Sequence, residues 1–130
     1  MDSLAWRGPR RRKSFRTSLG FAWAGLRYGV QTQPHLRFHL ATAAVVLAAG
    51  TFLGVSPLEL ALLLGTITLV IVTELLNTAV EAIVDLVTTE YHPLAKVAKD
   101  IAAGVVLAAA GGAVLVGLVI FLPYLIAILG

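Results

Sequence analysis

Three long stretches of the chain carry no formal charge and predict helices that cross a membrane. These stretches are residues 38–58, 60–73 and 101–130. The hydrocarbon core of a bilayer is roughly 30 Å thick, and an α-helix needs about 20 apolar residues to cross it. We therefore predict an all-α membrane protein whose spanning helices occupy residues 35–54, 58–87 and 96–122.

The segment before the first span has the pattern of a surface helix. Between Ser14 and Thr32, apolar residues recur at helical spacing while arginine, serine and glutamine fill the other faces. The apolar positions are Phe15, Leu19, Ala22, Trp23, Leu26 and Val30. Tryptophan and tyrosine favour the membrane–water interface, so we predict that residues 14–32 form an amphipathic interfacial helix.

Individual residues predict where the spanning helices begin and end, and one contact inside them. Pro34 interrupts the helix before the first span, and Pro123 marks the outer end of the third. Ser56 followed by Pro57 is typical of an N-cap and the first helical position. For His39, inside the first span, we expect a buried hydrogen bond rather than a metal.

The distribution of charge supports this class and sets an orientation. Hydrophobic residues make up 58% of the 130 residues and charged ones 13%, against about 25% charged in soluble domains. All ten Lys and Arg residues fall on one side of the three-span arrangement, five of them in a basic tail at residues 1–13. The positive-inside rule makes that side cytoplasmic, which predicts a multi-pass protein of the cytoplasmic (inner) membrane with its N-terminus inside. A cleaved secretory signal is disfavoured because the first apolar run begins only near Leu40.

The segment from Glu74 to Asp100 differs from the rest, since it holds five of the seven acidic residues. On one face of a helix, Glu74, Glu81 and Asp85 form an acidic stripe that Asn77 borders. A carboxylate near mid-span costs roughly 2.5–3.5 kcal/mol on insertion scales, so a metal ion or a basic partner is expected beside it. Basic partners are available where the third helix opens, at Lys96 and Lys99.

The same segment resembles a known family. The patterns E-L-L-N-T-A-V-E-x-x-x-D and E-Y-H-P-L-A-K-x-A-K-D-x-A-A-G are similar to those of the small bacterial integral-membrane lipid kinases, the diacylglycerol kinase/undecaprenol kinase family. The resemblance is concentrated between Glu74 and Gly104 and extends weakly from Ser14 to the C-terminus. It implies that residues 14–130 are one kinase domain that assembles as a homotrimer.

The resemblance also implies a role for particular residues in transferring the γ-phosphate of ATP to a lipid hydroxyl. Glu74 would be the catalytic base, Asn77 a neighbouring polar residue of the site, and Glu81 a ligand of Mg²⁺. Gln33 stands where some members carry a second acidic ligand of the metal. The implied ATP-binding residues are Ser14, Phe21, Glu90, Tyr91, His92, Lys99 and Asp100. The implied lipid-binding residues are Arg27, Tyr28, Gly29 and Val30.

Three positions depart from the family pattern. Gln33 offers a neutral amide oxygen in place of a carboxylate, Ser14 replaces an arginine, and Phe21 replaces a tyrosine. The loop T-T-E-Y-H-P-L-A-K-V-A-K-D resembles the undecaprenol kinase branch more than the diacylglycerol-preferring branch. The expected partners are therefore ATP and a membrane lipid alcohol, undecaprenol or diacylglycerol, with no nucleic acid.

The residues alone leave other functions open. Neither the phosphate-binding loop G-x-x-x-x-G-K-[ST] nor the protein-kinase glycine loop is present in the sequence. A small cation- or proton-coupled transporter could use the carboxylates of the acidic stripe as an ion path. A non-catalytic helix-bundle assembly factor is the remaining alternative. Phosphoryl transfer requires a metal, a cation on the phosphates and a carboxylate near the attacking hydroxyl, and the segment offers candidates for each.

Overall fold

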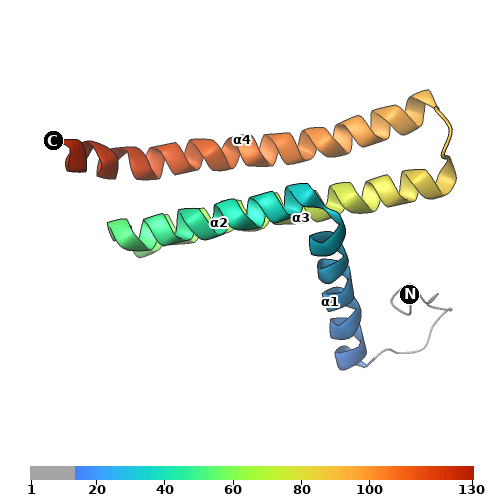
Figure 1. Ribbon diagram of the computed structural model, residues 1–130, viewed down its shortest axis with the longest axis horizontal. Helices are drawn as coiled ribbons and strands as arrows, with labels where there is room; N and C mark the ends of the chain where they lie inside the picture. The colour runs from blue at the N-terminus through green and yellow to red at the C-terminus, as the bar shows by residue number, and fades with distance from the viewer. Residues whose placement is uncertain (1–13) are drawn as a thin grey trace.

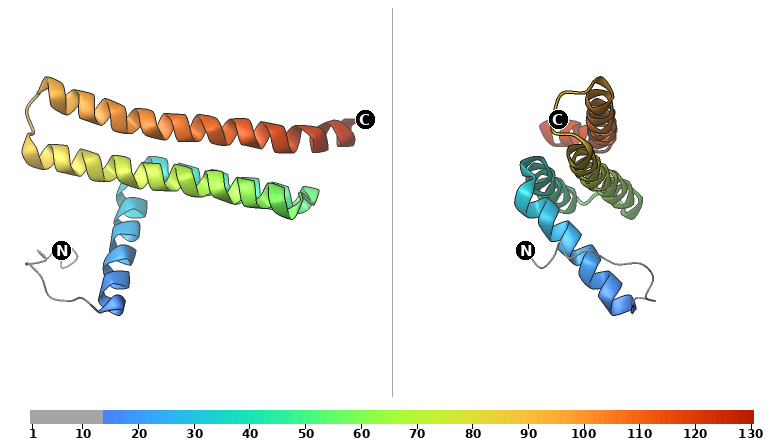
Figure 2. Two further views of the ribbon diagram at one scale, coloured as in Figure 1. Left: turned by 180° about the vertical axis from the view of Figure 1, so that it is seen from behind. Right: turned by 90° about the vertical axis from the view of Figure 1, so that its right-hand side faces the viewer.

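The computed structural model describes residues 14–130, which form four α-helices. They are α1 (Phe15–Thr32), α2 (Pro34–Leu53), α3 (Pro57–Val87) and α4 (Pro93–Leu129). Helices α2, α3 and α4 run side by side along the long axis, whereas α1 stands across them (Figure 1 and Figure 2). The basic tail predicted for residues 1–13 lies outside the described residues.

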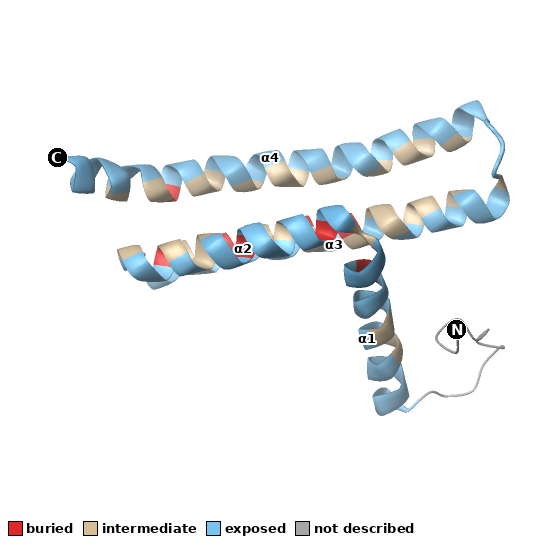
Figure 3. Ribbon diagram, viewed as in Figure 1, coloured by how far each residue is buried: buried red, intermediate tan, exposed pale blue. Residues whose placement is uncertain are grey.

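Helices α2, α3 and α4 are each long and apolar enough to cross a membrane. Most of their large apolar side chains face outward, as illustrated by Phe52 and Leu86, which are 88% and 86% exposed. Figure 3 shows how few positions of the described chain are buried. Such a surface is stable in lipid, where exposed apolar groups carry no hydration penalty and every backbone polar group is satisfied inside a helix. The predicted all-α class with three spanning helices is confirmed.

The start of α3 is fixed by its own sequence, as predicted. The Ser56 side chain accepts a hydrogen bond from the backbone N–H of Glu59, and the Glu59 carboxylate accepts one from the backbone N–H of Ser56, at 2.8 Å. This reciprocal capping box satisfies two backbone donors that the helix itself cannot. Pro57 then occupies the first turn, where its missing N–H costs nothing.

Helix α4 extends beyond the predicted segment 96–122 at both ends. It begins at Pro93, because the Nδ1 atom of His92 accepts the backbone N–H of Leu94 at 3.2 Å and caps the helix. It also continues through Pro123 to Leu129. Just after that proline, the Tyr124 hydroxyl donates to Glu59 Oε2 at 2.6 Å, which holds the outer part of α4 on the beginning of α3.

Helix α1 packs most closely against the bundle near its C-terminal end. Gly29 is its one buried residue. A Cβ atom at this position would lie 2.8 Å from Leu75 Cδ2 and 3.1 Å from Leu36 Cδ2. Glycine therefore permits a close approach of α1 to the α2–α3 pair that a larger residue would obstruct.

The turn between α1 and α2 is held by Arg37. Its Nη1 atom donates to the backbone oxygens of Val30 and Gln31, at 3.3 and 3.1 Å. These carbonyls belong to the last turn of α1 and lack partners within the helix. A cation at the C-terminus of a helix also interacts favourably with the helix dipole. Arg37 thus couples the orientation of α1 to the start of α2.

Candidate functional site

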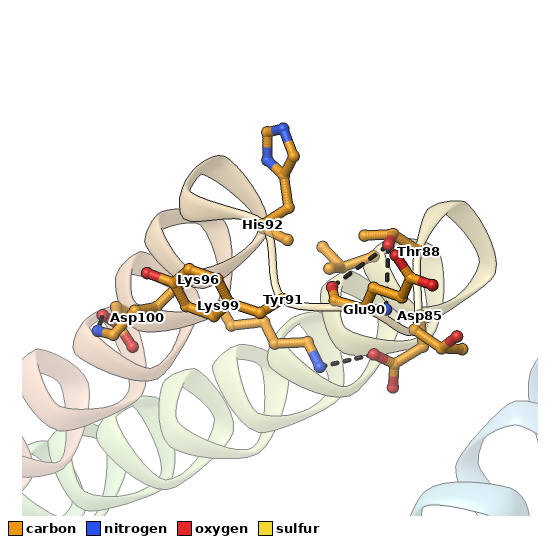
Figure 4. A pocket seen from close by; sticks show the side chains of 11 residues that line it. Asp85, Thr88, Glu90, Tyr91, His92, Lys96, Lys99 and Asp100 are labelled. Carbon is orange, nitrogen blue, oxygen red and sulfur yellow. Dashed lines mark hydrogen bonds and ion pairs between the residues drawn. The ribbon is translucent and has the colours of Figure 1, made fainter.

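A cavity of about 280 Å³, lined mostly by polar and charged residues, lies where α3 ends and α4 begins. We call it the loop cavity, and Figure 4 shows the side chains that surround it. Its lining residues are Val84, Asp85, Thr88, Thr89, Glu90, Tyr91, His92, Ala95, Lys96, Lys99 and Asp100. Five of the seven ATP-binding residues implied by the resemblance are among them, namely Glu90, Tyr91, His92, Lys99 and Asp100.

Short-range bonds shape the loop at residues 88–92. The Thr88 hydroxyl accepts the backbone N–H of Glu90 at 3.1 Å and lies 3.3 Å from the Glu90 backbone oxygen. His92 ends the loop as the N-cap of α4, and in Figure 4 its ring points away from Lys99 and Asp85. These local hydrogen bonds order the backbone that carries the polar side chains of the loop.

Both lysines of the loop cavity contact carboxylates. Lys99 Nζ lies 2.6 Å from Asp85 Oδ1, which ties α4 to α3. Lys96 contacts Asp100 one turn further along α4. All four side chains are substantially exposed, and exposed ion pairs contribute little net stability. The ammonium groups can therefore exchange their carboxylate partners for phosphate oxygens at low cost.

Glu74 occupies a different environment, deep between α2 and α3. It is 6% exposed and is the one buried charged residue of the part of the chain that the structure describes. His39 Nε2 on α2 lies 3.1 Å from Glu74 Oε1. The buried hydrogen bond predicted for His39 stays a prediction: the structure shows a half-buried ring in ion-pair contact with Glu74, a partner that the sequence did not reveal. A buried carboxylate is stable only when it is paired or hydrogen-bonded.

Between these two places lie Asn77 and Glu81. Asn77 Nδ2 donates to Glu81 Oε1 at 3.1 Å, while the Asn77 Oδ1 atom is buried without a hydrogen-bond partner. Within residues 14–130, no cluster of three or more acidic or histidine side chains forms a ready-made metal site. Glu81, together with the unpaired amide oxygen of Asn77, could hold a divalent cation only as part of a shell that substrate phosphates and water complete.

The acidic stripe therefore runs from the buried Glu74 to the loop cavity, which Asp85 lines. From Glu74 to Asp85 the helix advances by 11 residues, or about 16 Å at 1.5 Å per residue. Thr78 lies between them, and its hydroxyl donates to the Glu74 backbone oxygen at 3.0 Å. A ligand that contacts both ends must extend along α3 past Glu81.

The site residues predicted in the N-terminal part are spread over α1 and the turn after it. Ser14 and Phe21 are not among the residues that line the loop cavity. Of the four predicted lipid-binding residues, Arg27, Tyr28 and Val30 are exposed, and Gly29 is buried in the helix packing described above.

Gln33 occupies the N-cap position of α2. Its side chain makes no capping hydrogen bond there, and Nε2 donates instead to the Thr32 hydroxyl at 3.4 Å.

Other residues of interest were not predicted as site residues. Thr88 and Thr89 line the loop cavity, and their closeness in sequence to the E-Y-H-P motif was an available signal. Lys96 also lines it, and the sequence predicted this residue only as a basic partner of the acidic stripe. A second, largely apolar cavity of about 400 Å³ lies among α2, α3 and α4, and no sequence pattern indicated it. His39 and Phe38 line this apolar cavity together with residues of the other two helices.

Comparisons with known proteins identify the family of the chain. The family model described as prokaryotic diacylglycerol kinase matches residues 20–121. A diacylglycerol kinase of Synechocystis sp. is 46% identical over 86% of this chain and 65% of its own length, so the match spans slightly less than two thirds of that relative. An undecaprenol kinase of Bacillus subtilis is 41% identical over 96% of this chain and 100% of its own length. A diacylglycerol kinase of Escherichia coli is 33% identical over 69% of this chain and 74% of its own length. The chain is therefore a multi-pass membrane protein that belongs to the prokaryotic diacylglycerol kinase family, a family of lipid kinases.

Proposed function

We propose that this protein transfers the γ-phosphate of ATP to the hydroxyl group of a membrane lipid alcohol. The observation that carries the proposal is the placement of two sites on one face of α3. The loop cavity offers Lys96 and Lys99 to an anionic nucleotide, and the buried carboxylate of Glu74 lies further along the same helix. Phosphoryl transfer depends chiefly on positioning and charge stabilisation, which these groups supply.

In the proposed reaction, the loop cavity binds the nucleotide and Glu74 acts on the lipid hydroxyl. At the loop cavity, Lys99 exchanges Asp85 for phosphate oxygens, while Glu90, Tyr91 and His92 surround the rest of the nucleotide. The phosphates extend along α3 toward Glu74, which accepts the proton of the lipid hydroxyl. The lipid oxygen then forms a bond to the γ-phosphorus, the bond between that phosphorus and the bridging oxygen breaks, and ADP leaves with the bonding electron pair.

Mg²⁺ is the proposed cofactor, and it would neutralise the negative charge of the phosphates. Glu81 would hold it through its carboxylate, and the unpaired Oδ1 atom of Asn77 supports a second ligand from the same helix. Gln33 is a further proposed ligand, weaker because it is neutral. With few charged protein ligands, the site relies on ATP to bring the metal with it.

The proposed lipid is undecaprenol or diacylglycerol. The loop sequence favours undecaprenol, and one of the relatives that match this chain closely is named an undecaprenol kinase. The proposed lipid-facing positions are those on α1, where Arg27 and Tyr28 are exposed and could contact a headgroup. Helix α1 stands across the bundle (Figure 1), an orientation that supports its proposed place along the membrane surface.

We also propose that the protein is a homotrimer in the cytoplasmic membrane, with the loop cavity and the N-terminus on the cytoplasmic side. Gly104 and Gly112 on α4 support close packing between copies, because nothing in the described chain lies within 4 Å of a Cβ atom added at either position. The cytoplasmic orientation rests on the distribution of lysine and arginine.

The proposal is tested by incubating the purified protein with γ-labelled ATP, Mg²⁺ and a panel of lipid alcohols. We expect label in the lipid product, with undecaprenol and dioleoylglycerol as the first acceptors to compare. A Glu74→Gln variant that binds ATP normally is the control for contaminating kinases. Passage of cations or protons across vesicle membranes without ATP consumption would contradict the proposal and favour a transporter.

A further inference from the structure

The contact between His39 and Glu74 joins two spanning helices at the most enclosed acidic group of the described chain. His39 Nε2 lies 3.1 Å from Glu74 Oε1, and the two side chains are 20% and 8% exposed. The contact brings a ring nitrogen beside a carboxylate oxygen, and it is an ion pair when the imidazole is protonated. Because α2 carries the histidine and α3 the carboxylate, the contact depends on how the two helices pack.

The surroundings of His39 hold its ring in place. Leu36 and Ala43 are buried on the same side of α2, one turn before and one turn after the histidine. The rings of Phe38 and His39 meet edge to face, with centroids 5.6 Å apart. The histidine also borders the apolar cavity among α2, α3 and α4. The ring is therefore partly enclosed, in a mainly apolar setting between the spanning helices.

We infer that His39 is a positioning residue that aims the Glu74 carboxylate at the lipid hydroxyl. In this proposal the ring nitrogen beside Oε1 fixes the rotation of the carboxylate and leaves Oε2 as the oxygen that accepts the lipid's proton. This inference rests on the proposed function, in which Glu74 is the base. His39 itself does not touch the reacting atoms, and it acts only through the orientation of Glu74.

A purely structural bond and a positioning bond predict different kinetics. Loss of a structural bond lowers the amount of folded protein, with normal turnover per folded molecule. Loss of a positioning bond lowers kcat and leaves the KM values for ATP and lipid unchanged, since the misaligned group acts only in the transition state. Misplacing a catalytic group by about 1 Å costs up to about 10²-fold in rate.

The test compares substitutions at His39 in the purified full chain, assayed with ATP, Mg²⁺ and the better acceptor of undecaprenol and dioleoylglycerol. His39→Met removes the donor at similar size and should lower kcat by about 10-fold to 10²-fold with unchanged KM values. His39→Gln keeps an N–H at nearly the reach of Nε2 and should restore most of the rate. His35→Met, at an exposed position one turn earlier on α2, is the matched control and should behave as wild type.

A double mutant separates the inference from the function on which it rests. If His39 acts through Glu74, adding His39→Met to Glu74→Gln should cause no further loss of kcat. Normal kcat in His39→Met, together with a large loss in Glu74→Gln, would overturn the inference and leave the proposed function intact. Normal kcat in Glu74→Gln would instead overturn the assignment of the base.

If His39→Met fails to fold, two amide substitutions decide the question. Glutamine reaches Glu74 and the shorter asparagine does not. A higher kcat for His39→Gln than for His39→Asn, at equal KM values, supports positioning. Equal kcat values for the two variants refute it.

Discussion

In the described part of the chain, two acid–base contacts join neighbouring helices, and they differ in how far they are exposed. His39 and Glu74 join α2 to α3 at 3.1 Å, and Lys99 and Asp85 join α4 to α3 at 2.6 Å. The Glu74 side chain is 8% exposed, whereas that of Asp85 is 58% exposed. The buried pair is held by packing and is costly to break, while the exposed pair is screened by water and easily exchanged.

The difference matches the two tasks in the proposed reaction. A base must keep one orientation through every turnover, which a buried ion-pair contact provides. A phosphate-binding lysine must release one anionic partner and take another, which requires a weak pair. Each of the following predictions tests whether the two contacts are specialised in this way.

The largest effect is expected from Glu74→Gln, which removes the carboxylate of the buried pair. We expect kcat to fall by about 10²-fold to 10⁴-fold, the usual consequence of losing a general base. ATP binding should be unchanged because the loop cavity lies elsewhere on α3. The measurement is steady-state turnover with an ATP-binding assay on the same sample. A near-normal kcat would show that the buried pair has no catalytic role.

Lys99→Ala removes the cation of the exposed pair. We expect the KM for ATP to rise by about 10-fold to 10²-fold, as for loss of a hydrogen bond to a charged group worth about 1.5–3 kcal/mol. The KM for lipid should not change. Titrations of each substrate against a fixed concentration of the other provide the measurement. An unchanged ATP KM would reduce Lys99 to a membrane-interface anchor.

Gly29→Val tests the packing beside the buried pair. The added side chain would meet Leu75 and Leu36, where even a Cβ atom is close, and we expect a loss of about 1–3 kcal/mol in unfolding free energy. Gly25→Val is the control, because nothing lies within 4 Å of a Cβ atom there. Denaturant titration in detergent compares the two variants. Equal unfolding free energies for the two variants would mean that α1 shifts at this contact without loss of stability.

Gln33→Glu extends the comparison to the proposed Mg²⁺ site. A carboxylate near a divalent cation should lower the Mg²⁺ concentration for half-maximal rate by about fivefold, corresponding to about 1 kcal/mol. The measurement is a magnesium titration at saturating ATP and lipid. Identical curves for the variant and the wild type would remove residue 33 from the metal site.

The smallest effect is expected from Asp85→Asn, which frees Lys99 from its partner. Exposed ion pairs are worth about 0.2–1 kcal/mol, so the KM for ATP should fall by about 1.5-fold to fivefold. Asp100→Asn, which frees Lys96 in the same way, gives a comparison within the same cavity. A higher ATP KM in Asp85→Asn would mean that Asp85 contributes to nucleotide binding rather than competing with it.

The sequence determined those features that depend on neighbours along the chain. Uncharged runs predicted three spanning helices, because crossing a bilayer requires length and apolarity alone. Ser56 and Pro57 predicted the start of α3, because capping is a local interaction. The motif between Glu74 and Gly104 predicted the family, and most of the ATP-binding residues it implied line one cavity because they are close in sequence.

Only the tertiary structure decided which residues meet across helices. Helical periodicity gives the face on which His39 or Glu74 lies, but it does not give the rotation of α2 against α3 that brings them within 3.1 Å. The extension of α4 beyond Pro123 likewise accompanies a contact between Tyr124 and Glu59, at opposite ends of two helices. The pattern of residues along the chain determines where each helix lies and which face is polar. Contacts between helices depend instead on how the helices pack together, which no local stretch of sequence specifies.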